Sequence, residues 1–149
     1  MAALSHQIAD VCRVVIDGAT LSLAKTTTRA ALPIMRVEDL PAGVVVTTMP
    51  SKIEFEKKDR SNRIAKVSVD IAVQKKVADE INATIDPLSS FLEEVSDLFH
   101  GLVLEPADTP DSLDGGEDTT TIELIYSQDQ LYQNKMFFGL ITVTFRIEI

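Results

Sequence analysis

The longest regular pattern in the sequence is an alternation of apolar and polar side chains over residues 63–76. The apolar set is Ala65, Val67, Val69, Ile71 and Val73, and the polar set between them is Lys66, Ser68, Asp70 and Gln74. A period of two places the two sets on opposite faces of a β-strand, and one polar face is typical of an antiparallel sheet that is covered on one side. The rest of the chain must therefore supply a cover for the apolar face.

Several further strands are predicted around this one. Residues 52–76 read as a long hairpin whose tip lies near 57–62, because alternation stops there in a charged stretch. Pro50 is expected to end the strand before it, since proline cannot donate to a sheet ladder. The remaining predicted strands are 26–33 (an edge segment broken by Pro33), 44–49, 119–126 and 137–149.

Two amphipathic helices are predicted to provide the cover. The first spans about 3–22, where one face carries Leu4, Ile8, Val11, Val15 and Ala19. The second opens at Asp86-Pro87, with the aspartate as N-cap and the proline at the first helical position, and Gly101 is placed to stop it.

These elements predict an α+β fold, an antiparallel β-sheet with the N-terminal helix and a second helix packed on one face. A chain of 149 residues suits a single domain, 1–149. No apolar run approaches the length of a membrane span, and the first 25 residues hold no signal-peptide core, so no membrane association is expected. Cys12 is the single cysteine, which leaves no intramolecular disulfide to form.

Charge is distributed unevenly along the chain. The formal net charge is −9, which argues against a general nucleic-acid binder. Residues 1–77 hold 12 basic and 8 acidic side chains, whereas residues 78–149 hold 2 basic and 15 acidic ones. Such polarity suits binding between copies or stacked neighbours, although folding could equally mix the charges over one surface. The candidate contact residues, at a charged hairpin tip suited to an acidic protein surface, are Lys57, Lys58, Arg60, Arg63 and Lys66.

Residues 105–118 contain six carboxylates and no cation, a composition that predicts a long, mobile acidic loop. The acidic residues of this candidate loop include Asp108, Asp111, Asp114, Glu117 and Asp118. Their spacing lacks the alternating ligands and closing glutamate of a calcium loop, so a solvated or interface loop is preferred to a metal site.

No motif for catalysis or cofactor binding is present. The sequence has no phosphate-binding glycine loop, no dinucleotide fingerprint and no nucleophile elbow. His6 and Cys12 fall on different faces of the first helix, and His100 lies at the end of the second, so each is best explained as structural. We therefore expect no catalytic residue, no metal and no cofactor, and not an enzyme.

The order of elements nevertheless resembles a known family. The segments that carry the resemblance are Glu-Asp-Leu-Pro-Ala-Gly-Val-Val-Val at 38–46, the strand ending in Val-Gln-Lys-Lys at 73–76, the acidic-faced helix after it, and Tyr126-x4-Leu131 followed by Phe-Phe-Gly-Leu-Ile-Thr-Val-Thr-Phe-Arg at 137–146. Over nearly the whole chain this pattern is similar to the tail terminator (tail completion) proteins of long-tailed bacteriophages and to related neck proteins.

The resemblance implies a structural virion protein that forms a six-membered ring on the last ring of the tail tube. Such a ring ends tube polymerisation and offers a docking face to the neck or head-completion protein, while genomic DNA passes through the channel without sequence-specific binding. On this interpretation the acidic residues of the 105–118 loop face the lumen of the ring, where they would repel DNA. It also implies a location in the virion tail or neck, and in the host cytoplasm during assembly. The alternatives are a neck or head-closure connector, or, from another class, a small monomeric cytoplasmic binding domain.

Overall fold

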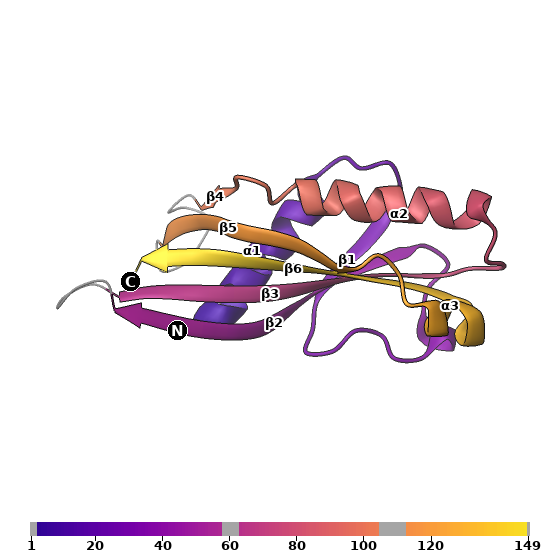
Figure 1. Ribbon diagram of the computed structural model, residues 1–149, viewed down its shortest axis with the longest axis horizontal. Coiled ribbons are helices and arrows are strands. Elements are labelled where there is room, and N and C mark those ends of the chain that lie inside the picture. The colour runs from indigo at the N-terminus through magenta and orange to yellow at the C-terminus, as the bar shows by residue number, and fades with distance from the viewer. Residues whose placement is uncertain (1–2, 58–62, 105–112, 149) are drawn as a thin grey trace.

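The computed structural model describes residues 3–57, 63–104 and 113–148, and it has an α+β fold. A single six-stranded sheet has the strand order β1-β2-β3-β6-β5-β4, with the helices packed against it (Figure 1). The strands are β1 (Lys25–Arg29), β2 (Val44–Lys57), β3 (Arg63–Lys76), β4 (Val103–Leu104), β5 (Asp114–Leu124) and β6 (Met136–Glu148). The helices are α1 (Leu4–Gly18), a 3-10 turn η1 (Val37–Asp39), α2 (Asn82–Asp97) and α3 (Gln128–Asn134).

The predicted alternation over 63–76 is confirmed as β3, which lies in the middle of the sheet between β2 and β6. β3 is antiparallel to both neighbours, and only β1, on the edge, runs parallel to its partner β2. The predicted hairpin is therefore the β2–β3 pair, whose tip at 58–62 lies outside the described residues.

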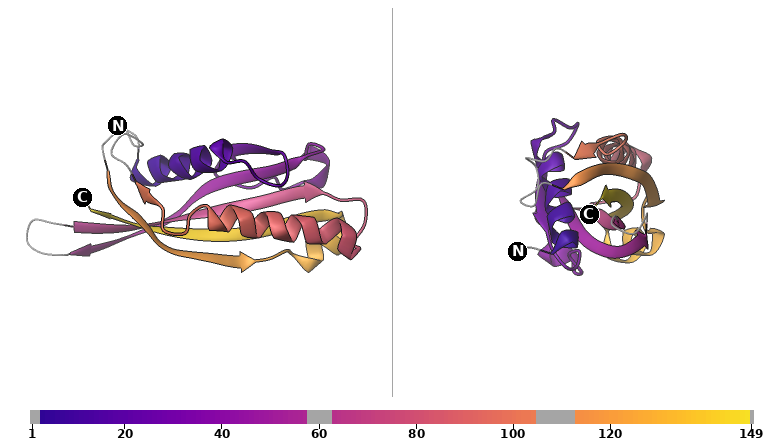
Figure 2. Two further views of the ribbon diagram at one scale, coloured as in Figure 1. Left: turned by 90° about the horizontal axis from the view of Figure 1, so that it is seen from above. Right: turned by 90° about the vertical axis from the view of Figure 1, so that its left-hand side faces the viewer.

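One face of the sheet carries the main hydrophobic core. The five apolar residues of β3 meet the buried side chains of α1 and α2, and Phe137, Ile141, Val143, Phe145 and Ile147 of β6 continue the same layer. Both long helices pack on this face, α1 against β1, β2 and β3 and α2 against β5 and β6 (Figure 2). The prediction that the N-terminal helix and a second helix cover one face is thus confirmed.

The helix boundaries differ from those predicted. α1 ends at Gly18 rather than near 22, and its buried centre is the Ile8, Cys12 and Ile16 row, so the apolar face is rotated from the one expected. α2 begins at Asn82, so Asp86 is not the N-cap and Pro87 lies inside the helix. Asp79 explains the early start, because its carboxylate accepts hydrogen bonds from Ile81 N at 3.3 Å and Thr84 Oγ at 2.6 Å.

Pro50 does not end its strand, which corrects the prediction. β1 pairs with β2 only as far as Thr48, so β2 is an edge strand from Pro50 onward. A proline on the outer side of an edge strand removes no ladder hydrogen bond, and the register with β3 shifts between Pro50 and Lys52. The strand then runs on to Lys57.

The prediction of an acidic loop over residues 105–118 is also corrected in part. Residues 105–112 lie outside the described residues, but Asp114, Glu117 and Asp118 belong to β5 and not to a loop. Glycine allows this pairing: a Cβ on Gly115 would overlap the Arg146 carbonyl oxygen and lie 3.0 Å from the Ile147 Cα. β5 and β6 can approach closely there only because residue 115 has no side chain.

The second face of the sheet has a smaller core at one end. The connection between β1 and β2 crosses this face, and there Leu40 packs with Val45 and Met136. Gln74, fully buried on β3, holds the connection in place: its amide accepts from Ile34 N at 3.1 Å and donates to Ile34 O at 2.6 Å.

Candidate interaction surfaces

The far half of the β2–β3 hairpin forms an arm, which we define as residues 51–57 and 63–68. The ends of its two strands extend past α1 and α2 (Figure 2). Most of its β2 half is exposed, and Phe55 keeps 54% of its surface in solvent. The Arg63 guanidinium lies over the Phe55 ring, 4.7 Å from its centroid, in a cation–π arrangement.

The predicted basic contact residues fall on this arm where they are described. Lys57 and Arg63 are exposed and pair across the two strands, whereas Lys58 and Arg60 lie outside the described residues. Lys66 is half-buried and forms an ion pair with Glu56 at 3.3 Å. Lys52 likewise forms an ion pair with Glu54, at 3.0 Å. The hydrogen bond from Lys52 is the main cause of the lowered pKa of the Glu54 carboxyl. The arm therefore carries cations and carboxylates in alternation beside an exposed aromatic ring.

The predicted acidic residues divide in a similar way. Asp108 and Asp111 lie outside the described residues, and Asp114 and Asp118 are exposed on β5. Glu117 has a structural role, since it accepts from Gly101 N at 3.3 Å and from Thr120 Oγ at 2.7 Å. A shallow acidic hollow of about 380 Å³ lies over the start of β5 and the end of β6.

Both lateral edges of the sheet are open in the described part of the chain. β1 is the last strand on one side, and no described strand pairs with its outer edge. On the other side β4 covers only Gly115 and Gly116, so residues 118–124 of β5 form an edge as well. Open edges offer unpaired backbone groups to another strand.

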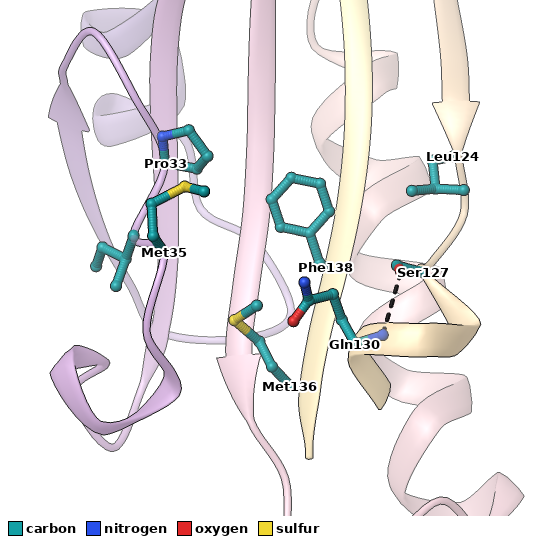
Figure 3. Close-up of a pocket in the computed structure, with 8 residues that line it drawn as sticks. Pro33, Met35, Leu124, Ser127, Gln130, Met136 and Phe138 are labelled. Carbon is teal, nitrogen blue, oxygen red and sulfur yellow. Dashed lines mark hydrogen bonds between the residues drawn. The ribbon is translucent and has the colours of Figure 1, made fainter. Parts of the chain in front are cut away.

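An apolar pocket of about 210 Å³ lies at the opposite end of the molecule from the arm, on the sheet face away from α1 and α2. Met136 and Phe138 of β6, Pro33 and Met35 of the β1–β2 connection, and Gln130 of α3 line it (Figure 3). Met35 is 69% exposed at its rim.

The side chains considered for chemistry are dispersed. His6 and His100 are exposed and lie on different helices or turns, while Cys12 is fully buried and burial raises the pKa of its thiol. Among the described residues, no group of three or more histidine, cysteine, aspartate or glutamate side chains could hold a metal ion. The helices in the described part are all too short or too polar to cross a membrane.

Sequence reasoning missed α3, although a signal was present. Ser127 caps the helix by accepting a hydrogen bond from Gln130 N at 3.2 Å. Serine followed three residues later by glutamine is the spacing of a capping box, which marks a helix start in a sequence. The edge position of β1 was predicted from Pro33 at the end of 26–33. The open edge of β5 was not, because strand order is not visible in a local pattern.

Comparison of the chain with models of known protein families and with curated proteins found no match.

Proposed function

We propose that this chain is a structural virion protein that forms a ring of six copies at the head-proximal end of a bacteriophage tail tube. There the ring ends tube polymerisation and presents the docking surface for the neck. The chain's partners are then other copies of itself, the tail tube protein and the neck or head-completion protein. Its role is mechanical rather than catalytic, and genomic DNA passes through the channel without sequence-specific binding.

The observation that carries the proposal is the arm. An isolated domain gains little from a hairpin that extends beyond its helices and leaves an aromatic ring more than half exposed, whereas a contact with a neighbouring ring would bury it. Arg63 adds a cation to the same patch, and aromatic and arginine side chains are enriched where protein interfaces bind most strongly.

The pattern resemblance and the charge distribution support the same role. The α+β fold agrees with what the resemblance implies, and the acidic C-terminal half would repel DNA from any wall that it lines. Within the same virion class, a neck or head-closure connector would use the arm equally well, and position in the particle separates the two.

The apolar pocket favours one alternative of a different class, a small monomeric binding domain. Its mixture of apolar walls with the polar Ser127 and Gln130 is typical of a ligand site, and its volume of about 210 Å³ would admit only a small molecule. A monomeric protein that binds an apolar small molecule and ignores tail tubes would support this alternative.

The direct test is to add purified protein to tubes assembled from the tail tube protein of the same phage and to image the tube ends by electron microscopy. We expect one added ring at one end of each tube and no further tube growth. A Phe55→Ala/Arg63→Glu variant should lose end binding while it keeps the circular dichroism spectrum of the unmodified chain. The matched control, Tyr132→Ala/Arg36→Glu, makes the same chemical changes away from the arm and should still cap.

Tubes that continue to grow in the presence of excess unmodified protein would contradict the proposal. Equal capping by the arm variant and the control would show instead that the arm is not the contact with the tube.

A further inference from the structure

We infer that neighbouring copies in the ring join edge to edge, with β1 of one copy pairing antiparallel with residues 119–122 of β5 in the next, the stretch between the two bulges of β5. This inference rests on the proposed ring and names the strands that build it. The occupant of each open edge is thus a second copy of this chain.

Strand direction fixes the antiparallel sense. β1 runs parallel to β2, and each following pair, β2–β3, β3–β6 and β6–β5, is antiparallel. β1 and β5 therefore run in opposite directions on opposite sides of one sheet. When copies stand side by side with the same polarity, as they do around a ring axis, the β1 edge of one copy meets the β5 edge of the next in antiparallel orientation.

The faces of the two strands restrict the register. On β1, Thr27 and Arg29 point to the helix-covered face, where they bond to Asp17 and Asp10 of α1 at 2.9 and 2.7 Å. On β5, Thr120 and Ile122 pair with Val143 and Ile141, which belong to the core on that face. Residues opposite each other in a sheet share a face. Between the two bulges of β5, over residues 119–122, the odd-numbered residues of β1 must therefore oppose the even-numbered residues of β5.

One of the registers that meet this condition also brings side chains of compatible chemistry opposite one another. It sets three threonine pairs opposite one another: Thr26 with Thr121, Thr27 with Thr120, and Thr28 with Thr119. Asp118 and Glu123 stand at the two bulges of β5, just beyond these pairs. There they lie near the Arg29 and Lys25 cations at the two ends of the neighbouring β1. Threonine pairs and opposite charges across strands both stabilise a sheet.

Exposure agrees with this pairing. Thr26, Thr28 and Arg29 are exposed on β1, as are Asp118, Thr119, Thr121 and Glu123 on β5. Arg29 bonds Asp10 through Nε, and its side chain is still 36% exposed. Because the two edges differ, the contact is head to tail, and repetition gives a closed ring or an open filament.

The test is disulfide cross-linking of the full-length chain at high protein concentration. In the proposed register, Thr26→Cys/Thr121→Cys and Thr28→Cys/Thr119→Cys place thiols directly opposite, about 4.5–5.5 Å apart at Cβ. The matched controls are Thr26→Cys/Thr119→Cys and Thr28→Cys/Thr121→Cys, whose thiols are displaced by two residues to roughly 7–8 Å, too far for a disulfide. Cys12 stays in all variants, because its burial keeps it from reacting.

We expect both matched variants to give a ladder of linked copies under mild oxidation, with at least tenfold more product than either control. Mixing the two single variants Thr26→Cys and Thr121→Cys should give linked dimers only, because each copy then has one thiol at an edge. Equal yields from matched and displaced pairs, or no cross-link in any variant, would overturn the inference.

The cross-linking experiment can succeed or fail independently of the tube-capping experiment that tests the proposed function. Rings of the expected mass without the matched cross-links would leave the ring standing and remove this pairing. Matched cross-links in a protein that does not cap tubes would keep the pairing and remove the proposed place at the tail end.

Discussion

Gln74 shows how one buried side chain can hold a long connection in place. Its amide satisfies both the N–H and the carbonyl of Ile34, 40 residues earlier in the chain, and the side chain is fully buried. The segment between β1 and β2 has little regular structure of its own beyond the short η1 turn. Its position over the sheet, and with it one wall of the apolar pocket, therefore depends on this amide and on the small core around Leu40.

Replacing Gln74 with leucine should lower the free energy of unfolding by about 1 kcal/mol, because the partly buried Ile34 N–H and carbonyl lose their hydrogen-bond partner. Denaturant unfolding followed by circular dichroism measures the change. Gln133→Leu, on the exposed side of α3, is the control and should stay within about 0.5 kcal/mol of the unmodified chain. A Gln74→Leu protein as stable as this control would show that the amide pair does not anchor the connection.

At the scale of single residues, the sequence predicted the environment of some side chains and not of others. Cys12 was predicted to be structural, and it is fully buried among the apolar residues of α1 that face the sheet. Gln74 was assigned to a polar, solvated face of its strand, and it is buried instead. That face is covered locally by the β1–β2 connection, and no periodicity in residues 63–76 can reveal a cover that comes from elsewhere in the chain.

The close approach of β5 and β6 depends on glycine. Gly115 pairs with Ile147, and the space where its Cβ would lie is already occupied by backbone atoms of β6. Backbone atoms cannot move aside as a flexible side chain can. β5 is also one of the two edges through which the copies are inferred to join.

Gly115→Ala should destabilise the protein by about 1–3 kcal/mol, the usual range for overpacking, and should weaken the pairing of β5 with β6. Thermal unfolding gives the first effect, and hydrogen exchange of the β5 amides gives the second. Gly18→Ala serves as the control, because nothing lies within 4 Å of the Cβ that it adds. Equal melting temperatures for the two variants would contradict the close approach described for β5.

Elements were predictable where the local pattern and the tertiary environment agree. The alternation over 63–76 gave β3 with its observed bounds, because both strands beside it and a covered face reinforce a period of two. The predictions of a strand end at Pro50 and of a loop over the acidic segment were wrong for different reasons. Proline is tolerated on an edge that only the sheet order reveals, and the glycines and carboxylates typical of loops occur in β5 because a close partner strand requires glycine.

On the scale of the whole molecule, the fold places three distinct surfaces around one sheet. The arm leaves one end, and the two unlike edges of β1 and β5 lie on opposite sides. The sequence predicted the fold class, the hairpin that forms the arm and the edge position of the 26–33 segment. It did not predict the open edge of β5, because that edge depends on the order of the strands in the sheet. A chain with two different open edges is suited to repeat head to tail.

The measurement that tests this account most directly is the mass of the purified protein in solution at high concentration, by light scattering or native mass spectrometry. Six copies of the 16.3 kDa chain would weigh about 98 kDa, and we expect that mass without intermediate sizes, because closure of a ring satisfies every edge. A single species at 16.3 kDa across the whole concentration range would contradict head-to-tail assembly and leave the monomeric binding domain as the better explanation.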